Sequence, residues 1–320
     1  MQRVVVMGDS HGTLPMVREA CHVAQMLGAD TVMSVGDFGI WPGSSGKQFL
    51  DATAKIADAR DVEMLITPGN HDDYDQLDAS PRDSTGRIVL RERVAAVERG
   101  AVVEIAGARW LCLSGAASID GPGGPWRPQN RGPLDEPADV RNGHGRVVPR
   151  RAGYDLGGWW PQERITDDDA QRAIAAADKH GPVDVMISHE APNDLELTGE
   201  LHKPTAWYAN VEQRDLVTAV HDAARPPVHL CGHWHVHRDL REQSRYIACL
   251  AADVTPADRQ WVLLEFDAGT IRVLAPRVWG TPVALTAPRV RGVGRAPNRH
   301  RVVSDLSDGD LAVVFETSLR

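Results

Sequence analysis

Cysteine is scarce in this sequence and is never paired. The 320 residues include only Cys21, Cys112, Cys231 and Cys249, and no two of them form a Cys-x-x-Cys pair. Each lies in an apolar segment, where a free thiol packs as a small hydrophobic side chain. This pattern argues against a disulfide framework and against a cysteine-ligated zinc site, so we expect four buried free thiols.

Long apolar runs and an excess of basic residues are also missing. No apolar stretch approaches the roughly 20 residues that cross a bilayer, and residues 3–7 are too short a run for a signal peptide. We therefore expect a cytoplasmic protein. With 35 basic and 44 acidic residues the net charge is −9, which argues against binding of nucleic acid through a broad basic face. A nucleic-acid substrate that reaches a metal-charged cleft stays possible.

The first 70 residues alternate between strand-like and helix-like patterns. Residues 2–7 are a β-branched run that ends in Gly-Asp, and residues 14–27 have a helical apolar period before Gly28, a suitable C-cap. A strand over 31–35, a helix over 46–59 and a strand over 62–67 follow. This order predicts an α/β fold, in which ligands bind at the carboxyl ends of strands.

The rest of the pattern is less regular. Runs at 88–90, 102–105 and 109–114 predict that the sheet continues with antiparallel strands. Thr166 is a good N-cap for a helix to residue 179, which explains the acids at 167–169 better than metal binding does. We expect the remaining elements to be a strand over 183–187, a helix over 211–223 capped by Asn210, and antiparallel-type strands over 228–231, 246–250, 261–266 and 271–274.

In two segments the apolar residues follow neither a helical nor a strand period. Residues 118–160 are rich in Gly, Pro and Arg, a composition typical of a lid, a binding loop or disorder. Its tryptophans are Trp126 near one end and the pair Trp159-Trp160 at the other. The pair either anchors the loop to the core, as we favour, or forms a wall of the substrate cleft. Beyond Arg277 the chain is either a solvated tail, as we favour, or a phosphate-binding arm. Its arginines include Arg289, Arg291, Arg295, Arg299 and Arg301.

Five short polar motifs each lie where a predicted strand ends. They are Gly8-Asp9-Ser10-His11-Gly12, Gly36-Asp37, Gly69-Asn70-His71-Asp72, Ser188-His189-Glu190 and Gly232-His233-Trp234-His235. Residues two apart on an extended segment point the same way, so we expect the last two histidines to face one site. Any one motif could be an ordinary turn, but five in order predict a shared site.

These residue types suit a centre of two divalent metals that hydrolyses a phosphate ester. The reaction needs a strong nucleophile and a sink for phosphoryl charge, and two metals about 3.5–4 Å apart supply both. Mixed oxygen and nitrogen ligands favour manganese, iron or zinc over calcium, and manganese is our first expectation. The predicted ligands are Asp9, His11, Asp37, Asn70, His189, His233 and His235.

From residue 1 to about 275 this series of motifs resembles the calcineurin-like metallophosphoesterase superfamily. The resemblance implies a four-layer α/β/β/α sandwich with mixed sheets and a dinuclear centre. It implies that Asp9, His11 and His235 hold one metal, that Asn70, His189 and His233 hold the other, and that Asp37 bridges them. It also implies in-line attack by a metal-bridging hydroxide, with His71 serving the leaving oxygen or the phosphoryl charge and Asn70 also contacting phosphate.

The sequence departs from the protein Ser/Thr phosphatase branch of that superfamily. Where that branch has the Asp that orients its catalytic histidine and an Arg that binds phosphate, this chain has Ile40 and Trp41. We therefore do not expect a protein phosphatase. The residue that orients His71 stays open, since Asp72 or Asp73 could do so or could have only turn roles.

The flanks of the long loop are similar to uncharacterised bacterial and phage members of the superfamily. These flanks are residues 113–120 and 157–163, which we expect to be nearly adjacent in those proteins. We therefore interpret 121–149 as an inserted loop in a metallophosphoesterase domain of residues 1–277, followed by an Arg-rich extension over 278–320.

Three functions remain. The first is a phosphoesterase acting on a small phosphodiester or phosphomonoester of the nucleotide type, which the acidic balance favours. The second is a nuclease of the same superfamily, using the Arg-rich tail and the long loop to hold a strand. The third is a non-catalytic scaffold, which need not keep His71 and all seven ligands and is therefore the weakest.

Overall fold

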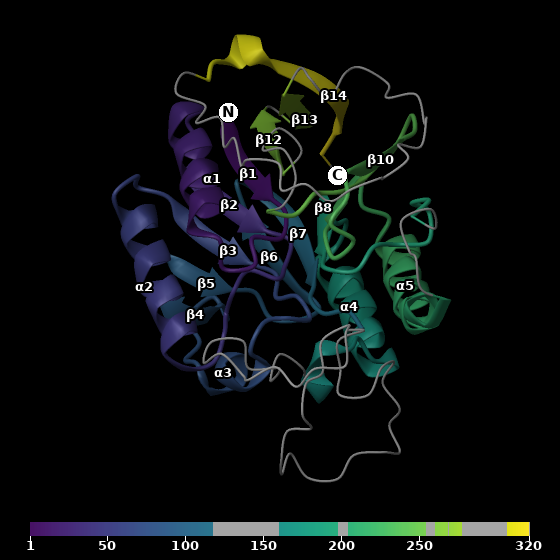
Figure 1. Ribbon diagram of the computed structural model, residues 1–320. Helices are drawn as coiled ribbons and strands as arrows, with labels where there is room; N and C mark the ends of the chain where they lie inside the picture. Colours follow the sequence, from purple (N-terminus) through teal and green to yellow (C-terminus); the bar gives the residue numbers. More distant parts are fainter. Residues whose placement is uncertain (118–159, 198–203, 254–259, 268, 277–305, 320) are drawn as a thin grey trace, which may run out of the picture.

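The computed structural model describes residues 1–117, 160–197, 204–253, 260–267, 269–276 and 306–319. Two mixed β-sheets lie face to face, and helices cover the outer face of each (Figure 1). This is the four-layer α/β/β/α sandwich that the resemblance implied, so the predicted fold class is confirmed.

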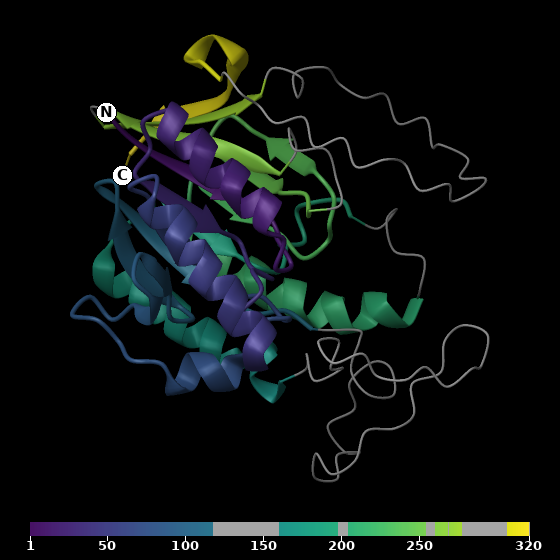
Figure 2. The ribbon, with the colours of Figure 1, turned by 60° about the vertical axis from the view of Figure 1, so that its left-hand side comes forward.

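The first sheet has eight strands in the order β14-β13-β12-β1-β2-β3-β5-β4. Strands β1, β2, β3 and β5 run parallel, and antiparallel strands complete both sides. Helices α1 (Leu14–Met26) and α2 (Gly43–Asp58) lie side by side over its outer face (Figures 1 and 2). The strands are β1 (Gln2–Met7), β2 (Thr31–Ser34), β3 (Glu63–Ile66), β4 (Ile88–Arg91), β5 (Val94–Ala96), β12 (Trp261–Asp267), β13 (Thr270–Pro276) and β14 (Leu311–Ser318).

The second sheet has six strands in the order β10-β11-β9-β8-β7-β6. Its inner strands run parallel, and β10 and β6 are antiparallel edges. Helices α4 (Asp167–His180) and α5 (Pro204–Ala224) pack on each other outside it. The strands are β6 (Ala101–Ile105), β7 (Ala108–Leu113), β8 (Val185–Ser188), β9 (Val228–Cys231), β10 (Arg238–Arg241) and β11 (Tyr246–Cys249).

Side chains that alternate along the strands fill separate cores. In β1, Val5 and Met7 join the cluster with α1 and α2, whereas Val4 and Val6 join the cluster between the sheets. Because neighbouring side chains of a strand point to opposite faces, a strand covered on both faces must be apolar throughout. This explains why the buried strands are continuous runs in the sequence and why their polar residues begin only where each strand ends.

Several local predictions are confirmed. Gly28 follows α1 with a φ of 67°, and Thr166 caps α4 by accepting a hydrogen bond from the Asp169 amide. The first turn of α4 is acidic, as the helix dipole favours. The four cysteines are free and buried. Among the described helices, none is long and apolar enough to span a membrane.

Other local predictions are wrong. Strands β6 and β7 begin the second sheet instead of continuing the first, and β11 is parallel to β9, not antiparallel. Helix α5 begins at Pro204, so Asn210 lies inside it and does not cap it. Strand order and direction are set by contacts between distant segments, which the local pattern does not contain.

Part of the expected C-terminal tail belongs to the fold. Residues 311–318 form β14, which pairs with β13 and buries Leu311 and Phe315, so a solvated tail is wrong for this stretch. Trp160 is buried in the same core cluster as residues of α1 and α2, as an anchoring role requires. The proposed insertion over 121–149, Trp126, Trp159 and the arginines between 289 and 301 lie outside the described residues.

Candidate metal centre

The predicted ligands gather at the carboxyl ends of parallel strands from both sheets. In two groups the ligand atoms lie within 4.8 Å of one another: Asp9, His11, Asp37 and His235 form one, and Asp37, His189 and His233 form the other. Asp37 belongs to both groups, as a bridging ligand must. Beside the second group, Oδ1 of Asn70 lies 3.0 Å from Nε2 of His189. The fold therefore brings all seven predicted ligands together.

Each carboxylate in this cluster keeps one oxygen free of hydrogen bonds. Oδ2 of Asp9 accepts from the His233 amide at 2.8 Å, and Oδ1 of Asp37 accepts from the His71 amide at 2.8 Å. The other oxygens, Oδ1 of Asp9 and Oδ2 of Asp37, are buried without a hydrogen bond. A buried carboxylate oxygen without a partner is costly, and a bound cation would compensate it.

The histidine rings face these carboxylates at close range. Nε2 of His11 and Nε2 of His235 are only 2.9 Å apart, and the rings of His189 and His233 have centroids 5.1 Å apart. Nitrogens that bind one metal at about 2.0–2.1 Å lie about 3–4 Å apart, so the short His11–His235 separation is compatible with a shared metal. The donor set therefore fits two divalent metals with oxygen and nitrogen ligands.

The electrostatics of the cluster favour positive charge at His189 and a neutral ring at His233. Burial alone would raise the pKa of Asp37, but the adjacent His189 and His71 outweigh it and hold that pKa well below its usual range. Burial would lower the pKa of His189, but Asp37 and Asp9 outweigh it and raise that pKa to about 10. Burial lowers the pKa of His233. Divalent cations would satisfy the same two carboxylates and leave the imidazoles neutral, as metal ligation requires.

The backbone of four ligands is in the left-handed region. The φ angles of His11, Asp37, His233 and His235 are 45°, 44°, 69° and 56°. The prediction that His233 and His235 lie on an extended segment is therefore wrong, because β9 ends at Cys231 and both histidines reach the centre from a turn. Such backbone conformations are uncommon for residues other than glycine and concentrate at functional sites.

Glycines make room for the ligands. A Cβ on Gly36 would collide with the ring of His189, and a Cβ on Gly232 would collide with the carboxylate of Asp9. In both cases the obstructed residue is a ligand from the opposite sheet. The pairing of Gly with a ligand in the sequence motifs thus reflects close approach of two strand ends.

His71 belongs to neither group of ligands. Its ring centroid lies 5.8 Å from that of His11, and its side chain is partly exposed, at the edge of the centre. Of the two acids that follow it, Asp72 accepts hydrogen bonds from the amides of residues 38, 39, 40 and 69, and Asp73 caps α3 (Tyr74–Ala79). Both acids therefore have the turn roles that we considered for them. Ile40 is fully buried in the core.

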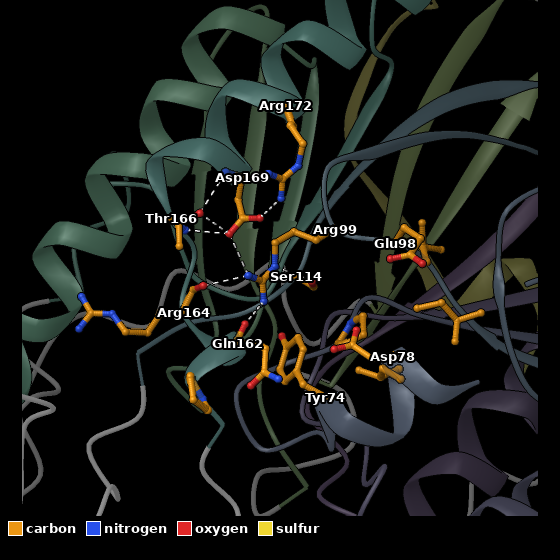
Figure 3. A pocket seen from close by; sticks show the side chains of 15 residues that line it. Tyr74, Asp78, Glu98, Arg99, Ser114, Gln162, Arg164, Thr166, Asp169 and Arg172 are labelled. Carbon is orange, nitrogen blue, oxygen red and sulfur yellow. Dashed lines mark hydrogen bonds and ion pairs between the residues drawn. The ribbon is translucent and has the colours of Figure 1, made fainter. Parts of the chain in front are cut away.

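A pocket of about 380 Å³ lies elsewhere, between α3 and the start of α4, and no predicted ligand lines it (Figure 3). Arg99 spans it and donates to Oδ2 of Asp169 at 3.0 Å, to the Arg164 carbonyl at 2.8 Å and to Oγ of Ser114 at 3.2 Å. Because Arg99 is engaged by the fold itself, we assign this pocket no role in the chemistry.

Solved structures with a similar fold include proteins from two organisms. Among solved structures, one similar chain is a dimetal phosphatase from Danio rerio, with a TM-score of 0.50, 13% identity, and 85% of this chain and 95% of that chain covered. Another is GAP50, the anchor in the inner membrane complex of Plasmodium, with a TM-score of 0.51, 7% identity, and coverage of 99% and 88%. At these identities the likeness shows the fold alone.

The sequence comparisons are more specific. No curated protein matches the sequence at a significant level. Residues 2–237 match the calcineurin-like phosphoesterase family, a range that includes all seven predicted ligands and His71. The chain belongs to the calcineurin-like phosphoesterase family.

Proposed function

We propose that this protein is a phosphoesterase whose centre uses two divalent metals to hydrolyse a phosphodiester or phosphomonoester. The observation that carries the proposal is the place of Asp37, whose carboxylate belongs to both groups of ligand atoms. One of its oxygens is buried without a hydrogen bond. When bound, two metals would acidify a water molecule and offset the charge on the phosphoryl oxygens.

The protein's own residues have separate tasks in this proposal. Asp37 is fixed by the amide of His71, so the bridging carboxylate and the imidazole beside it keep a constant relation. The imidazole of His71, at the edge of the centre, donates a proton or a hydrogen bond to the departing oxygen. Asn70, whose Oδ1 lies near His189, directs its side-chain amide toward the phosphate.

We infer the substrate class from the net charge of the protein. A net charge of −9 disfavours a long polyanion and favours a small, nucleotide-type substrate that a pair of metals can hold unaided. Manganese is the metal we favour, with iron or zinc as alternatives, because the ligands are oxygen and nitrogen atoms without thiolates. We also propose a cytoplasmic location.

Two alternatives share the fold. A nuclease would use the Arg-rich segment beyond residue 277 to hold a strand, and its activity would depend strongly on salt. A scaffold would use only the surface, and the name of the Plasmodium neighbour describes an anchor. The complete set of ligands favours an enzyme, because a scaffold gains nothing from buried, unpaired carboxylate oxygens.

Hydrolysis by protein reconstituted with manganese tests the proposal. Bis-p-nitrophenyl phosphate, p-nitrophenyl phosphate and a single-stranded oligonucleotide would be compared, with Asp37→Asn as the control. We expect metal-dependent turnover of a small ester that Asp37→Asn abolishes. Turnover chiefly of the oligonucleotide would favour the nuclease, and two bound metals without turnover of any substrate would contradict the phosphoesterase proposal for these ester classes.

A further inference from the structure

Glu190 is a buried carboxylate beside the centre. It follows His189 directly, its side chain is fully buried, and it belongs to neither group of ligand atoms. Burial raises the pKa of Glu190 to about 7. Glu190 is the last residue of the Ser188-His189-Glu190 motif, but the sequence alone does not explain why this position holds a carboxylate.

The two oxygens of Glu190 have different surroundings. Oε1 accepts hydrogen bonds from Nε1 of Trp234 at 2.6 Å and from the amide of Ala191 at 2.7 Å. The Trp234 ring is covered by the guanidinium of Arg214, at 5.3 Å, which also donates to the carbonyls of Pro192 and Leu195. The carboxylate is therefore held firmly through Oε1 alone.

Oε2 of Glu190 points to a predicted ligand. It is buried without a hydrogen bond and lies 3.5 Å from Nε2 of His233. The backbone of His233 is fixed independently, because its amide donates to Asp9. A small rotation of the ring would turn this separation into a hydrogen bond, for which Nε2 must carry the proton when Glu190 is ionised.

His189 shows the same arrangement with the ring nitrogens exchanged. Its Nδ1 lies 3.1 Å from the carbonyl of Val35, which can only accept, so Nδ1 carries the proton. Its Nε2 faces Oδ1 of Asn70 at 3.0 Å and Asp37 at 3.3 Å, so Nε2 is the nitrogen that would give up its proton on binding a metal. Ligand histidines commonly hold their second nitrogen on a carbonyl or a carboxylate, which fixes the tautomer and the ring orientation.

We propose that Glu190 is a positioning residue: it accepts a hydrogen bond from Nε2 of His233 and thereby presents the unprotonated Nδ1 of that ring to the second metal. The inference rests on the proposed function, since it requires a second metal beside His233. It concerns the tautomer of one ligand, so it can be tested without turnover.

The substitution Glu190→Gln separates this role from packing. A glutamine that keeps both hydrogen bonds to its oxygen must direct its NH₂ group at His233. Nε2 would then have to accept, and the ring proton would move to Nδ1, the nitrogen that should bind the metal. The matched control is Glu163→Gln, which alters another fully buried glutamate whose carboxylate accepts from the amide of Trp160.

Calorimetric titration of the metal-free proteins with manganese gives the first readout. We expect Glu190→Gln to bind the second metal about 10–100-fold more weakly than wild type, with the first metal and the melting temperature little changed. Glu163→Gln should bind both metals like wild type. Equal affinities in Glu190→Gln and wild type, or equal losses in both variants, would overturn the role of Glu190 alone. A wild-type protein that binds no second metal would overturn the proposed function, and with it this role.

Imidazole ¹⁵N shifts of the metal-free proteins give the second readout, which needs no metal. Long-range ¹H–¹⁵N spectra separate protonated from unprotonated ring nitrogens. We expect one histidine to exchange its Nε2-protonated pattern for an Nδ1-protonated one in Glu190→Gln, and no such exchange in Glu163→Gln. Identical histidine patterns in Glu190→Gln and wild type would overturn the inference.

Discussion

His71 lies close to the metal ligands without being one of them. Its amide donates to Asp37, but its ring belongs to neither group of ligand atoms. We expect His71→Gln to lower kcat about 10²–10⁴-fold, the usual contribution of a general acid, while metal affinity stays near that of wild type. Asp37→Asn should lose both turnover and metal binding, because it removes the ligand that the two groups share. Turnover and bound metal, measured on the same samples, check this, and loss of both metals from His71→Gln would contradict the division of roles.

Which residues form the centre could be predicted, but not how the chain presents them. Strand ends are recognisable in the sequence, because an apolar run stops at Gly and is followed at once by Asp, Asn or His. The left-handed backbone of His233 could not be predicted, since it depends on a hydrogen bond to Asp9 from the other sheet. The environment of Glu190 was hidden for the same reason. Its neighbours Trp234 and Arg214 come from distant parts of the chain.

At the scale of elements, long periodic segments were predictable, whereas short segments and the pairing of the strands were not. Helix α1 and strand β1 match the pattern closely, whereas α3 has six residues and β5 only three, too few to show a period. Strand β14 was missed because its apolar alternation follows a long stretch rich in Arg, Gly and Pro. The parallel pairing of β11 with β9 depends on a connection that reverses direction through β10.

A buried chain of hydrogen bonds joins α5 to strands β9 and β8. Oγ of Ser188 donates to the Glu190 carbonyl at 2.6 Å, so it accepts from Nε2 of His229 at 2.7 Å. Nδ1 of His229 then accepts from Nδ1 of His221 at 3.1 Å. Protonation of His229 would set two N–H groups against each other. Burial, with His221 adding to it, accordingly holds the pKa of His229 well below its usual range.

This chain of bonds predicts that acid destabilises the fold. His229 stays neutral in the folded state, whereas the unfolded chain binds a proton there below about pH 6.5. The free energy of unfolding should therefore fall as the pH drops below that value, by up to about 1.4 kcal/mol per unit for this group. Denaturant unfolding between pH 8 and 5, in the presence of a chelator, measures it. His229→Gln should show a shallower dependence, and a slope equal to that of wild type would refute the assignment.

At the scale of the whole molecule, the centre joins the two sheets. Asp9 and Asp37 follow strands of the first sheet, whereas His189 and His233 follow strands of the second. Metals bound by both groups would therefore connect the sheets at one end, in addition to the apolar core between them. Metal binding and global stability should be coupled, because the unfolded chain cannot gather ligands from five strand ends.

Removal of metal should lower the melting temperature. Metal at about 100 times its dissociation constant adds roughly 2.7 kcal/mol per site. With an unfolding entropy of about 2.1 cal/mol/K per residue over 320 residues, this raises the melting temperature by about 4 °C per site, or about 8 °C for two sites. Thermal unfolding of chelator-treated protein, followed by titration with manganese, measures the rise. In Asp37→Asn the rise should largely vanish, because both groups of ligands share that carboxylate. In Glu163→Gln it should match wild type, since that glutamate belongs to neither group. Equal rises in wild type and Asp37→Asn would mean that manganese acts elsewhere on the protein, and that the two sheets are held together without it.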